Sequence, residues 1–410
     1  MTLQDTMNEL GRDARAAAAA LRSAPAEQRS AAILAMAAGV RANAAAILEA
    51  NAADVAAATG MIDRLRLDQA RVEAIAAALD EIAALPDPVG AEIARWQRPN
   101  GLDIARVRTP IGVIGMIYES RPNVTADAAA ICVRSGNAII LRSGSEALAS
   151  ALAIHAALAA GLEQAGLPAA AVQIVPVADR AAVGMMLDGL DGTIDLIIPR
   201  GGKALVERVA ADARVPVLGH LEGVCHTYVH ASADPAMAAA VVRNAKLRRV
   251  SVCGSTETLL IDRARAAEVL PVIAAALDGC ELRGNAEARA ILPMGQASEE
   301  DWSTEYLAPV LSVRVVGGLE AAVAHIARHG TGHTEAIVAE DPAAAERFLD
   351  AVDSAIVMWN ASTQFADGGE FGFGAEIGIA TGKLHARGPV GPEQLTTFKY
   401  VVRGNGQVRP

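Results

Sequence analysis

The chain has 410 residues, more than one ordinary hydrophobic core accommodates, so we expect two domains. Its formal charge of −11 opposes sequence-independent binding to nucleic-acid backbones or anionic membranes, and only 3% of its residues are aromatic, which is too few for a base-stacking platform. We therefore expect neither nucleic acid nor a membrane as a partner.

The cellular setting is suggested by the N-terminus and the cysteines. Asp5 and Glu9 lie where a signal peptide needs a basic and then an apolar run. The four cysteines include no C-x-x-C pair and no spacing typical of a disulfide framework. We therefore expect a cytoplasmic protein with reduced cysteines, one of which is a candidate nucleophile.

The first ninety residues are predicted to be helical, because Ala-rich runs carry charged residues at helical spacing up to Pro86. LDIARVRTP then alternates like an exposed strand, and IGVIGMIY is an apolar run typical of a buried parallel strand. The charge-free stretch between Glu146 and Glu163 is too short for a membrane span and is predicted to be a buried helix.

Helix and strand patterns alternate from there onward, which predicts a parallel sheet covered on both faces. The segment KALVERVAADA is predicted to be a helix and VPVLGHLEG the strand that follows it. A second α/β unit is expected from about residue 226 to residue 355. The tail LTTFKYVVRGNGQ alternates like an edge strand, a type that often pairs with another subunit.

Cys253 lies in NAKLRRVSVCGSTETLLID, between a predicted helix and a predicted strand, with Gly254 and Ser255 directly after it. This is how a nucleophile is presented at the junction of two elements. A thiol with the usual pKa of about 8.5 needs nearby cations or backbone N–H groups to react as thiolate. A buried, unreactive cysteine fits the local pattern equally well.

Gly201 and Gly202 open a predicted helix in TIDLIIPRGGKALVERV, where free N–H groups and the helix dipole favour an anion. The dinucleotide fingerprint G-x-G-x-x-G is absent, and a simple turn is the more common role of paired glycines. Asn123 follows a predicted strand in YESRPNVT and either donates to an oxyanion or satisfies its own turn.

A third segment, GHLEGVCHTYVH, places three histidines and a cysteine within eleven residues, which resembles a metal-binding pattern. If CHTYVH is a strand, however, Cys225 and His226 point to opposite faces. Because the candidate ligands diverge, we expect no metal site.

Taken in order, GMIYESRPNVT, SGNAIILRSGSEA, NAKLRRVSVCGSTETLL, TEYLAPVLSV and KLHARGP closely resemble the gamma-glutamyl phosphate reductase family, a branch of the aldehyde dehydrogenase superfamily. The resemblance covers essentially the whole chain. It implies an aldehyde dehydrogenase-like α/β fold with three parts. These are a Rossmann-type cofactor domain over residues 1–224 with an oligomerisation flap at 98–110, an α/β catalytic domain over 225–384, and a C-terminal segment over 385–410 that carries an oligomerisation strand.

The resemblance also implies a reaction. NADPH reduces L-glutamyl 5-phosphate to glutamate 5-semialdehyde, releasing phosphate and NADP, in proline biosynthesis. A homo-oligomer and functional coupling to glutamate 5-kinase are implied as well.

Residue roles follow from the same resemblance. Cys253 is similar to the nucleophile of the family and Asn123 to its oxyanion donor. Glu305 resembles the carboxylate that holds the nicotinamide ribose, and Arg142 the basic residue near the adenosine ribose. Ser145 stands where NAD-preferring relatives carry Glu. Three positions depart from the family pattern: Ser143, Ser251 and Gln364 replace Gly, Gly and Arg.

Two alternatives remain at this stage. One is reduction of another acyl substrate on the same scaffold, since a scaffold does not fix its substrate. The other is a catalytically silent nucleotide-binding oligomer.

Overall fold

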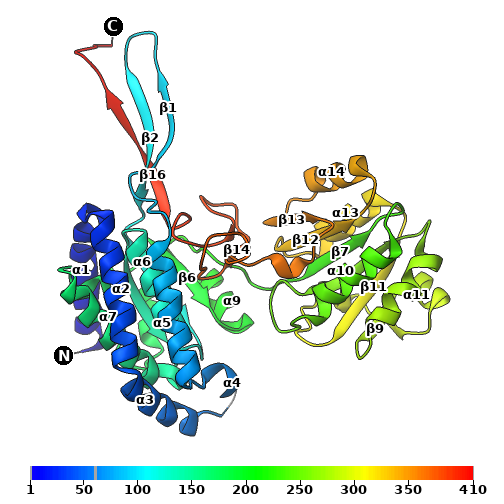
Figure 1. The fold of residues 1–410 in the computed structure, drawn as a ribbon, viewed down its shortest axis with the longest axis horizontal. Coiled ribbons are helices and arrows are strands. Elements are labelled where there is room, and N and C mark those ends of the chain that lie inside the picture. Colours follow the sequence, from blue (N-terminus) through cyan, green and yellow to red (C-terminus); the bar gives the residue numbers. More distant parts are fainter. Residues whose placement is uncertain (1, 60–61, 410) are drawn as a thin grey trace.

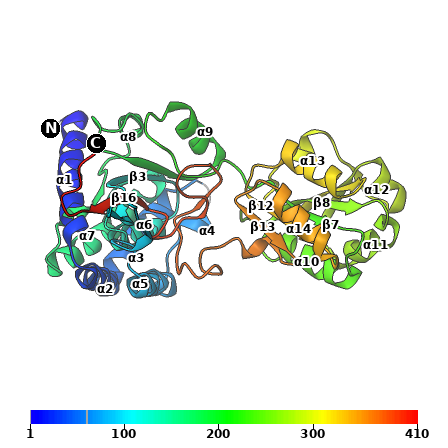
Figure 2. The ribbon, with the colours of Figure 1, turned by 90° about the horizontal axis from the view of Figure 1, so that it is seen from above.

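The computed structural model describes residues 2–59 and 62–409. It consists of two α/β lobes and a thin β arm that projects from the first lobe (Figure 1). Seen from above, the lobes lie side by side and are joined by extended segments (Figure 2). The functional residues discussed below come from both lobes and from these connecting segments.

The first lobe is built on a four-stranded parallel sheet in the order β5-β4-β3-β6. Its strands are β3 (Val113–Tyr118), β4 (Ala138–Ser143), β5 (Val172–Ile174) and β6 (Leu196–Arg200). The two central strands, β3 and β4, are buried along their whole length, as their continuous apolar runs predict. The strand order reverses between β3 and β6, which places a ligand crevice at the carboxyl ends of these two strands.

Helices cover both faces of this sheet. They are α1 (Leu3–Ser23), α2 (Ala26–Ala42), α3 (Ala44–Ala57), α4 (Ile62–Leu65), α5 (Gln69–Ala84), α6 (Asn123–Arg134), α7 (Leu148–Gln164), α8 (Ala181–Leu187) and α9 (Lys203–Asp212). The helical prediction for the first ninety residues is confirmed.

Helix α7 shows that length alone does not separate a core helix from a membrane span. With the short turn before it, it covers residues 145–164 and is long and apolar enough to cross a membrane, contrary to the length argument from the sequence. Helices α2 and α3 taken together would also be long and apolar enough to cross a membrane, but they bend by 67° at their junction. Both pack directly against α7, whose inward residues belong to the first core. α7 is therefore placed as a core helix.

The second lobe contains a seven-stranded parallel sheet in the order β10-β9-β11-β8-β7-β12-β13. Its strands are β7 (Cys225–Val229), β8 (Thr256–Asp262), β9 (Glu281–Gly284), β10 (Gly295–Gln296), β11 (Val310–Val316), β12 (Thr334–Val338) and β13 (Ile356–Trp359). The helices around it are α10 (Pro235–Leu247), α11 (Ala266–Ala276), α12 (Ala286–Ile291), α13 (Leu319–His329) and α14 (Pro342–Ala351).

The arm is a three-stranded antiparallel sheet of β1 (Glu92–Gln97), β2 (Asp103–Pro110) and the C-terminal β16 (Thr396–Arg403). Its register pairs Thr397 with Thr109, so segments almost three hundred residues apart in the chain lie side by side. Trp96, Phe398 and Tyr400 are largely exposed and stack edge to face on one another.

The structure corrects two predictions made from the sequence, one of a strand and one of a domain limit. VPVLGHLEG forms no regular strand, because only Val217 of this segment bridges back to Ile197 of β6 before the chain crosses to the second lobe. The catalytic domain that the resemblance implies, residues 225–384, includes Ile377 and Ala380, whereas both pack in the core of the first lobe. They do so because the chain returns through the short strand pair of β14 (Ile379–Ala380) and β15 (Gly388–Pro389).

Buried histidines of the second lobe make its stability sensitive to acid. His325 is 5% exposed, accepts a hydrogen bond from Arg314 and stacks on Trp302. Burial, with the nearby charges of His226 and Arg314, lowers the pKa of His325 to about 2. The unfolded chain takes up a proton there below about pH 6.5 and the folded chain does not.

We therefore predict that the urea midpoint, followed by tryptophan fluorescence, falls as the pH drops from 7.5 to 5.5. This group contributes up to about 1.4 kcal/mol per pH unit below its unfolded pKa. His325→Gln keeps an acceptor for Arg314 and flattens the profile, whereas replacing the exposed His385 by Gln does not. Identical pH profiles for wild type and His325→Gln would contradict this account.

Candidate active site

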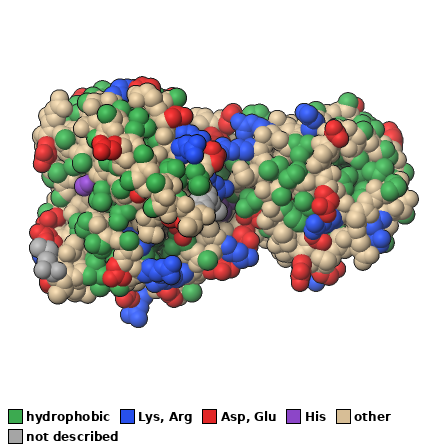
Figure 3. Space-filling model, turned by 90° about the horizontal axis from the view of Figure 1, so that it is seen from below, with side chains coloured by type: hydrophobic (Ala, Val, Ile, Leu, Met, Phe, Trp, Pro, Cys, Tyr) green, Lys and Arg blue, Asp and Glu red, His purple; other side chains and the backbone are tan. Residues whose placement is uncertain are grey.

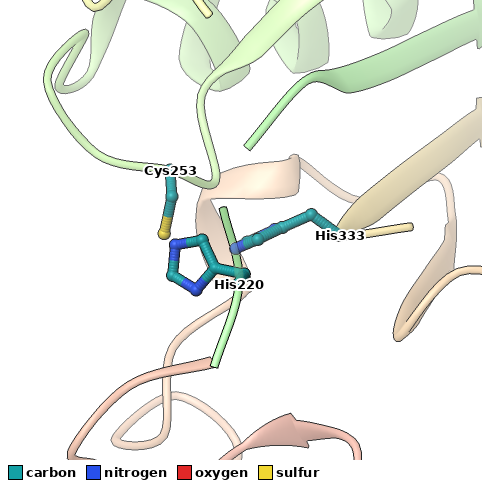
Figure 4. Close-up of side chains that lie close together, drawn as sticks. All are labelled: His220, Cys253 and His333. Carbon is teal, nitrogen blue, oxygen red and sulfur yellow. The ribbon is translucent and has the colours of Figure 1, made fainter. Parts of the chain in front are cut away.

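Three side chains converge at the amino ends of three neighbouring strands of the second sheet. Cys253 lies in the turn before β8, His220 in the segment before β7, and His333 directly before β12. The sheet order β8-β7-β12 makes these strands neighbours, and parallel strands begin at the same edge. The Cys253 Sγ and one ring nitrogen from each histidine all lie within 4.8 Å of one another. Figure 4 shows the Cys253 sulfur pointing toward the His220 ring.

Hydrogen bonds fix the state of His220. Its Nδ1 lies 2.7 Å from the carbonyl oxygen of Ile379, and because a carbonyl only accepts, Nδ1 carries the proton. Nε2 is then a free acceptor. Burial lowers the pKa of His220, and it lowers the pKa of His333 well below its usual range, so both rings are neutral at pH 7. His220 is thus prepared to take a proton from the thiol beside it.

The Cys253 thiol sits between opposing charges. Burial raises its pKa to about 11, the positive charge of Arg200 lowers it, and the carboxylates of Glu376 and Glu305 raise it further. Cys253 is therefore a thiol at neutral pH in this state of the protein. A base, or added positive charge from a bound ligand, is needed to form the thiolate.

The carboxyl edge of the first sheet faces this thiol. Arg200 ends β6 and Arg121 follows β3, and both have electrostatic contact with Cys253. Burial and the charge of Arg200 lower the pKa of Arg121 to about 10, which still leaves it protonated at pH 7. Between β3 and Arg121, Ser120 adopts a left-handed φ of 44°. Strain of this kind concentrates at functional turns. Figure 3 shows Lys and Arg side chains gathered where the lobes meet.

A close backbone approach sets the position of the cysteine turn. A Cβ built on Gly223 would lie 2.0 Å from the carbonyl oxygen of Cys253, so only glycine fits there. The Cys225 thiol donates to the same carbonyl oxygen at 3.1 Å. Sequence analysis did not identify Gly223. Its only signal is its place two residues before β7.

Asn123 is the first residue of α6, and its side chain is exposed. Its amide Nδ2 donates to Asp127 at 2.9 Å, which leaves its second N–H for another acceptor. The pKa of Asp127 is raised to about 6 by burial and is lowered in part by Asn123 and Arg200. Arg200 therefore acts on both the α6 terminus and the Cys253 thiol.

The backbone donors at Gly201 and Gly202 are already partly used by a side chain of the protein. Gly202 precedes α9, and its N–H donates to the Glu119 carboxylate at 3.0 Å. A Cβ on Gly201 would lie 2.6 Å from the same carboxylate, so the loop after β3 packs tightly on this turn. A phosphate at this helix end would share its donors with Glu119 or displace it.

A group of arginines surrounds the carboxyl end of β4. Arg142 is 8% exposed, donates to the carbonyl of Ala178 and has a buried Nε without a partner. Burial lowers its pKa, as do the charges of Arg180 and Arg208, while the carboxylates of Glu119 and Asp179 raise it. Ser145 is exposed next to this group. Sequence analysis found Arg142 and Ser145 and missed the other two arginines, which come from a loop and from α9.

Glu305 lies half-buried in the loop before β11 and within electrostatic reach of Cys253. Burial raises its pKa, and a hydrogen bond from the Gly223 backbone lowers it. Behind it, the ammonium of Lys246 forms a fully buried ion pair with Glu257. Lys246, a cation seven residues before Cys253 in the sequence, is thus already paired.

The three departures from the family pattern are accommodated. Ser251 is not among the residues with positive φ, so its position does not require glycine. Gln364 donates to the carbonyls of Ala245 and Arg249 and so ties down the end of α10. Ser143 is buried at the end of β4, where its hydroxyl donates to the carbonyl of Gly144.

The fold and this junction define a two-lobed α/β protein with a cysteine between a nucleotide-type sheet and a second parallel sheet. The model of the aldehyde dehydrogenase family matches residues 3–302. A gamma-glutamyl phosphate reductase from Caulobacter vibrioides is 69% identical and covers 98% of this chain and 100% of its own length.

Solved structures agree with this match. A gamma-glutamyl phosphate reductase from Thermotoga maritima is 42% identical, with a TM-score of 0.96 over 98% of this chain and 100% of its own. A glyceraldehyde-3-phosphate dehydrogenase from Methanocaldococcus jannaschii, complexed with NADP, is 16% identical with a TM-score of 0.71 over 98% of this chain and 95% of its own, which shows the shared fold. The chain belongs to the aldehyde dehydrogenase family, and within it to the gamma-glutamyl phosphate reductases. It is an oxidoreductase.

The four cysteines are predicted to differ in reactivity toward iodoacetamide. Burial raises the pKa of Cys253 and of Cys280 to about 11, so both modification rates rise about tenfold per pH unit from 8 to 10. Cys132 and Cys225 are fully buried, and burial raises the pKa of both, so the folded protein protects them. Peptide mass spectrometry gives the four rates. A plateau for Cys253 below pH 9 would mean that the folded site already stabilises a thiolate.

Proposed function

We propose that this protein reduces L-glutamyl 5-phosphate to L-glutamate 5-semialdehyde with NADPH, releasing phosphate, as a step of proline biosynthesis in the cytoplasm. The observation that carries this proposal is the position of the Cys253 thiol, between Arg121 and Arg200 of one lobe and His220 at the lobe junction. The names of the close relatives supply the substrate.

In the proposed reaction, the anionic acyl phosphate binds near Arg121 and Arg200 and strengthens the positive side of the site. The Cys253 thiol gives its proton to Nε2 of His220, and the sulfur attacks the acyl carbon. The Asn123 amide and the Cys253 backbone N–H donate to the tetrahedral oxyanion. Loss of one such donor typically costs about 3 to 4 kcal/mol. Phosphate leaves, and a thioester remains on the cysteine.

Bound NADPH supplies the hydride that converts the thioester to the aldehyde. Glu305 is proposed to hold the nicotinamide ribose, and its electrostatic contact with Cys253 fits a place beside the reacting carbon. Gly201 and Gly202 are proposed to contact the pyrophosphate. Arg142, with its unpartnered Nε, and the neighbouring Arg180 and Arg208 fit a 2′-phosphate.

The parts of the chain are proposed to divide the work. Residues 1–224 bind the cofactor, and residues 225–384 carry the nucleophile, although Ile377 and Ala380 of this range pack on the first lobe. Residues 385–410 complete the arm, to which residues 98–110 contribute β2. The exposed aromatic face of this arm supports pairing with another copy into a homo-oligomer. Functional coupling to glutamate 5-kinase fits a labile acyl phosphate that is best used where it is made.

The function is tested by NADPH oxidation with glutamyl phosphate generated in situ by a coupled glutamate kinase. We expect Cys253→Ala to abolish the rate and Cys280→Ala to preserve it, because Cys280 lies in the second lobe away from the junction. Activity with an acyl-CoA but not with the acyl phosphate would favour a different acyl substrate. Nucleotide binding without any turnover would favour a silent oligomer.

Cofactor choice is predicted to depend on Ser145. A carboxylate at this exposed position would repel a 2′-phosphate near Arg142 and accept the ribose hydroxyls of NADH. We expect Ser145→Glu to lower the ratio of kcat/KM for NADPH over NADH at least about tenfold, and Ser145→Ala to leave it near the wild-type value. Equal use of both cofactors by the wild type would overturn the assignment.

A further inference from the structure

The histidine-rich segment around β7 does not form a metal site by itself. The Cys225 sulfur lies 3.1 Å from the carbonyl oxygen of Cys253, His226 is buried in a pair with Glu335, and His230 hydrogen-bonds Ser232. These side chains diverge, as the strand alternation predicts. His220 behaves differently, because it meets Cys253 and His333, two residues from distant parts of the sequence.

This second group has the chemistry of a zinc site. It offers one thiol and two imidazoles, ligands typical of zinc, with the ligand atoms within 4.8 Å of one another. Bond lengths of about 2.0 to 2.3 Å in a tetrahedral site require ligand atoms roughly 3.3 to 3.7 Å apart. Since the three atoms lie within 4.8 Å of one another, they need to approach by at most roughly 1.5 Å to bind one ion.

Both imidazoles are in the state that a metal requires. His220 donates its Nδ1–H to the Ile379 carbonyl, the arrangement that orients many metal-bound histidines and leaves Nε2 free. His333 is fully buried, and its Nε2 has no hydrogen-bond partner although its Nδ1 contacts Thr334. Both are neutral because burial lowers their pKa. A buried polar atom without a partner calls for an explanation, and a ligand is one.

The charges around the three side chains nearly balance. Glu305 and Glu376 act on Cys253 with negative potential, whereas Arg200 and Arg121 oppose them with positive potential. Cys253 and His220 are partly exposed, so an ion reaches the site from solvent.

We propose that His220, Cys253 and His333 bind one zinc ion when no substrate is present, and that the ion reversibly blocks the cysteine. Binding forms a sulfur–zinc bond and releases the thiol proton to solvent, while water fills the fourth position. This revises the expectation that the protein has no metal site. Zinc binding does not depend on the proposed reaction, whereas the loss of activity rests on the proposed role of Cys253.

The test titrates the chelator-treated full-length protein with Zn²⁺ against a chromophoric chelator of known affinity. We expect one ion per chain with a dissociation constant of about 1 µM or tighter. Cys253→Ala and His333→Asn should each weaken binding at least about 100-fold, while the matched replacements Cys280→Ala and His230→Asn leave it unchanged. Circular dichroism checks that each variant is folded.

Two readouts on the wild type keep the proposal testable if the His333 variant fails to fold. Zn²⁺ should slow the iodoacetamide modification of Cys253 but not of Cys280, and Cd²⁺ should produce a thiolate-to-metal absorption band. Binding weaker than about 100 µM, or equally tight without Cys253, would overturn the site. Cysteine-dependent binding that leaves turnover intact would instead overturn the proposed role of Cys253 and not the metal site.

Discussion

The contact between Gly223 and the Cys253 carbonyl is the constraint on which the functional junction depends. It leaves no room for a side chain at residue 223 and presses the segment that leaves the first lobe against the cysteine turn. His220 lies three residues earlier and Cys225 two residues later, so one backbone contact places a neutral histidine beside the thiol and lies close to the start of β7. A larger residue at 223 would move all of these groups at once.

The same junction fits the proposed binding of an anionic substrate to a chain with a charge of −11. Long-range attraction is unfavourable, so the proposal depends on the local positive charge of Arg121 and Arg200 at the carboxyl edge of the first sheet. Burial keeps the thiol protonated, and the carboxylates of Glu376, on the returning connection, and of Glu305, in the second lobe, add to this effect. Because the positive and negative charges around Cys253 nearly cancel, a charged ligand can shift the balance between its thiol and its thiolate.

The sequence predicts the elements well and their meeting points poorly. Cys253 and the buried strand β3 are visible in local patterns, because a strand-junction cysteine and a continuous apolar run are short-range signals. Val217 was wrongly assigned to a strand, because periodicity does not show that the chain is about to cross between lobes. His333 and Arg180 have no local signal, and Gly223 has only its place two residues before β7, since the importance of all three arises from neighbours that the fold brings close.

That sheet order also ties the proposed base to the proposed metal site. A histidine that takes a thiol proton must be neutral, with its lone pair directed at the sulfur, and these are also the requirements for a metal ligand. A change at His220 that removes its ability to accept the thiol proton therefore also removes its ability to bind a metal. His333 is different, because it is fully buried behind the thiol and the proposed reaction gives it no proton to carry. The tendency of this cysteine to bind metal is therefore set by His333, and changing that residue separates zinc affinity from the activation of the thiol.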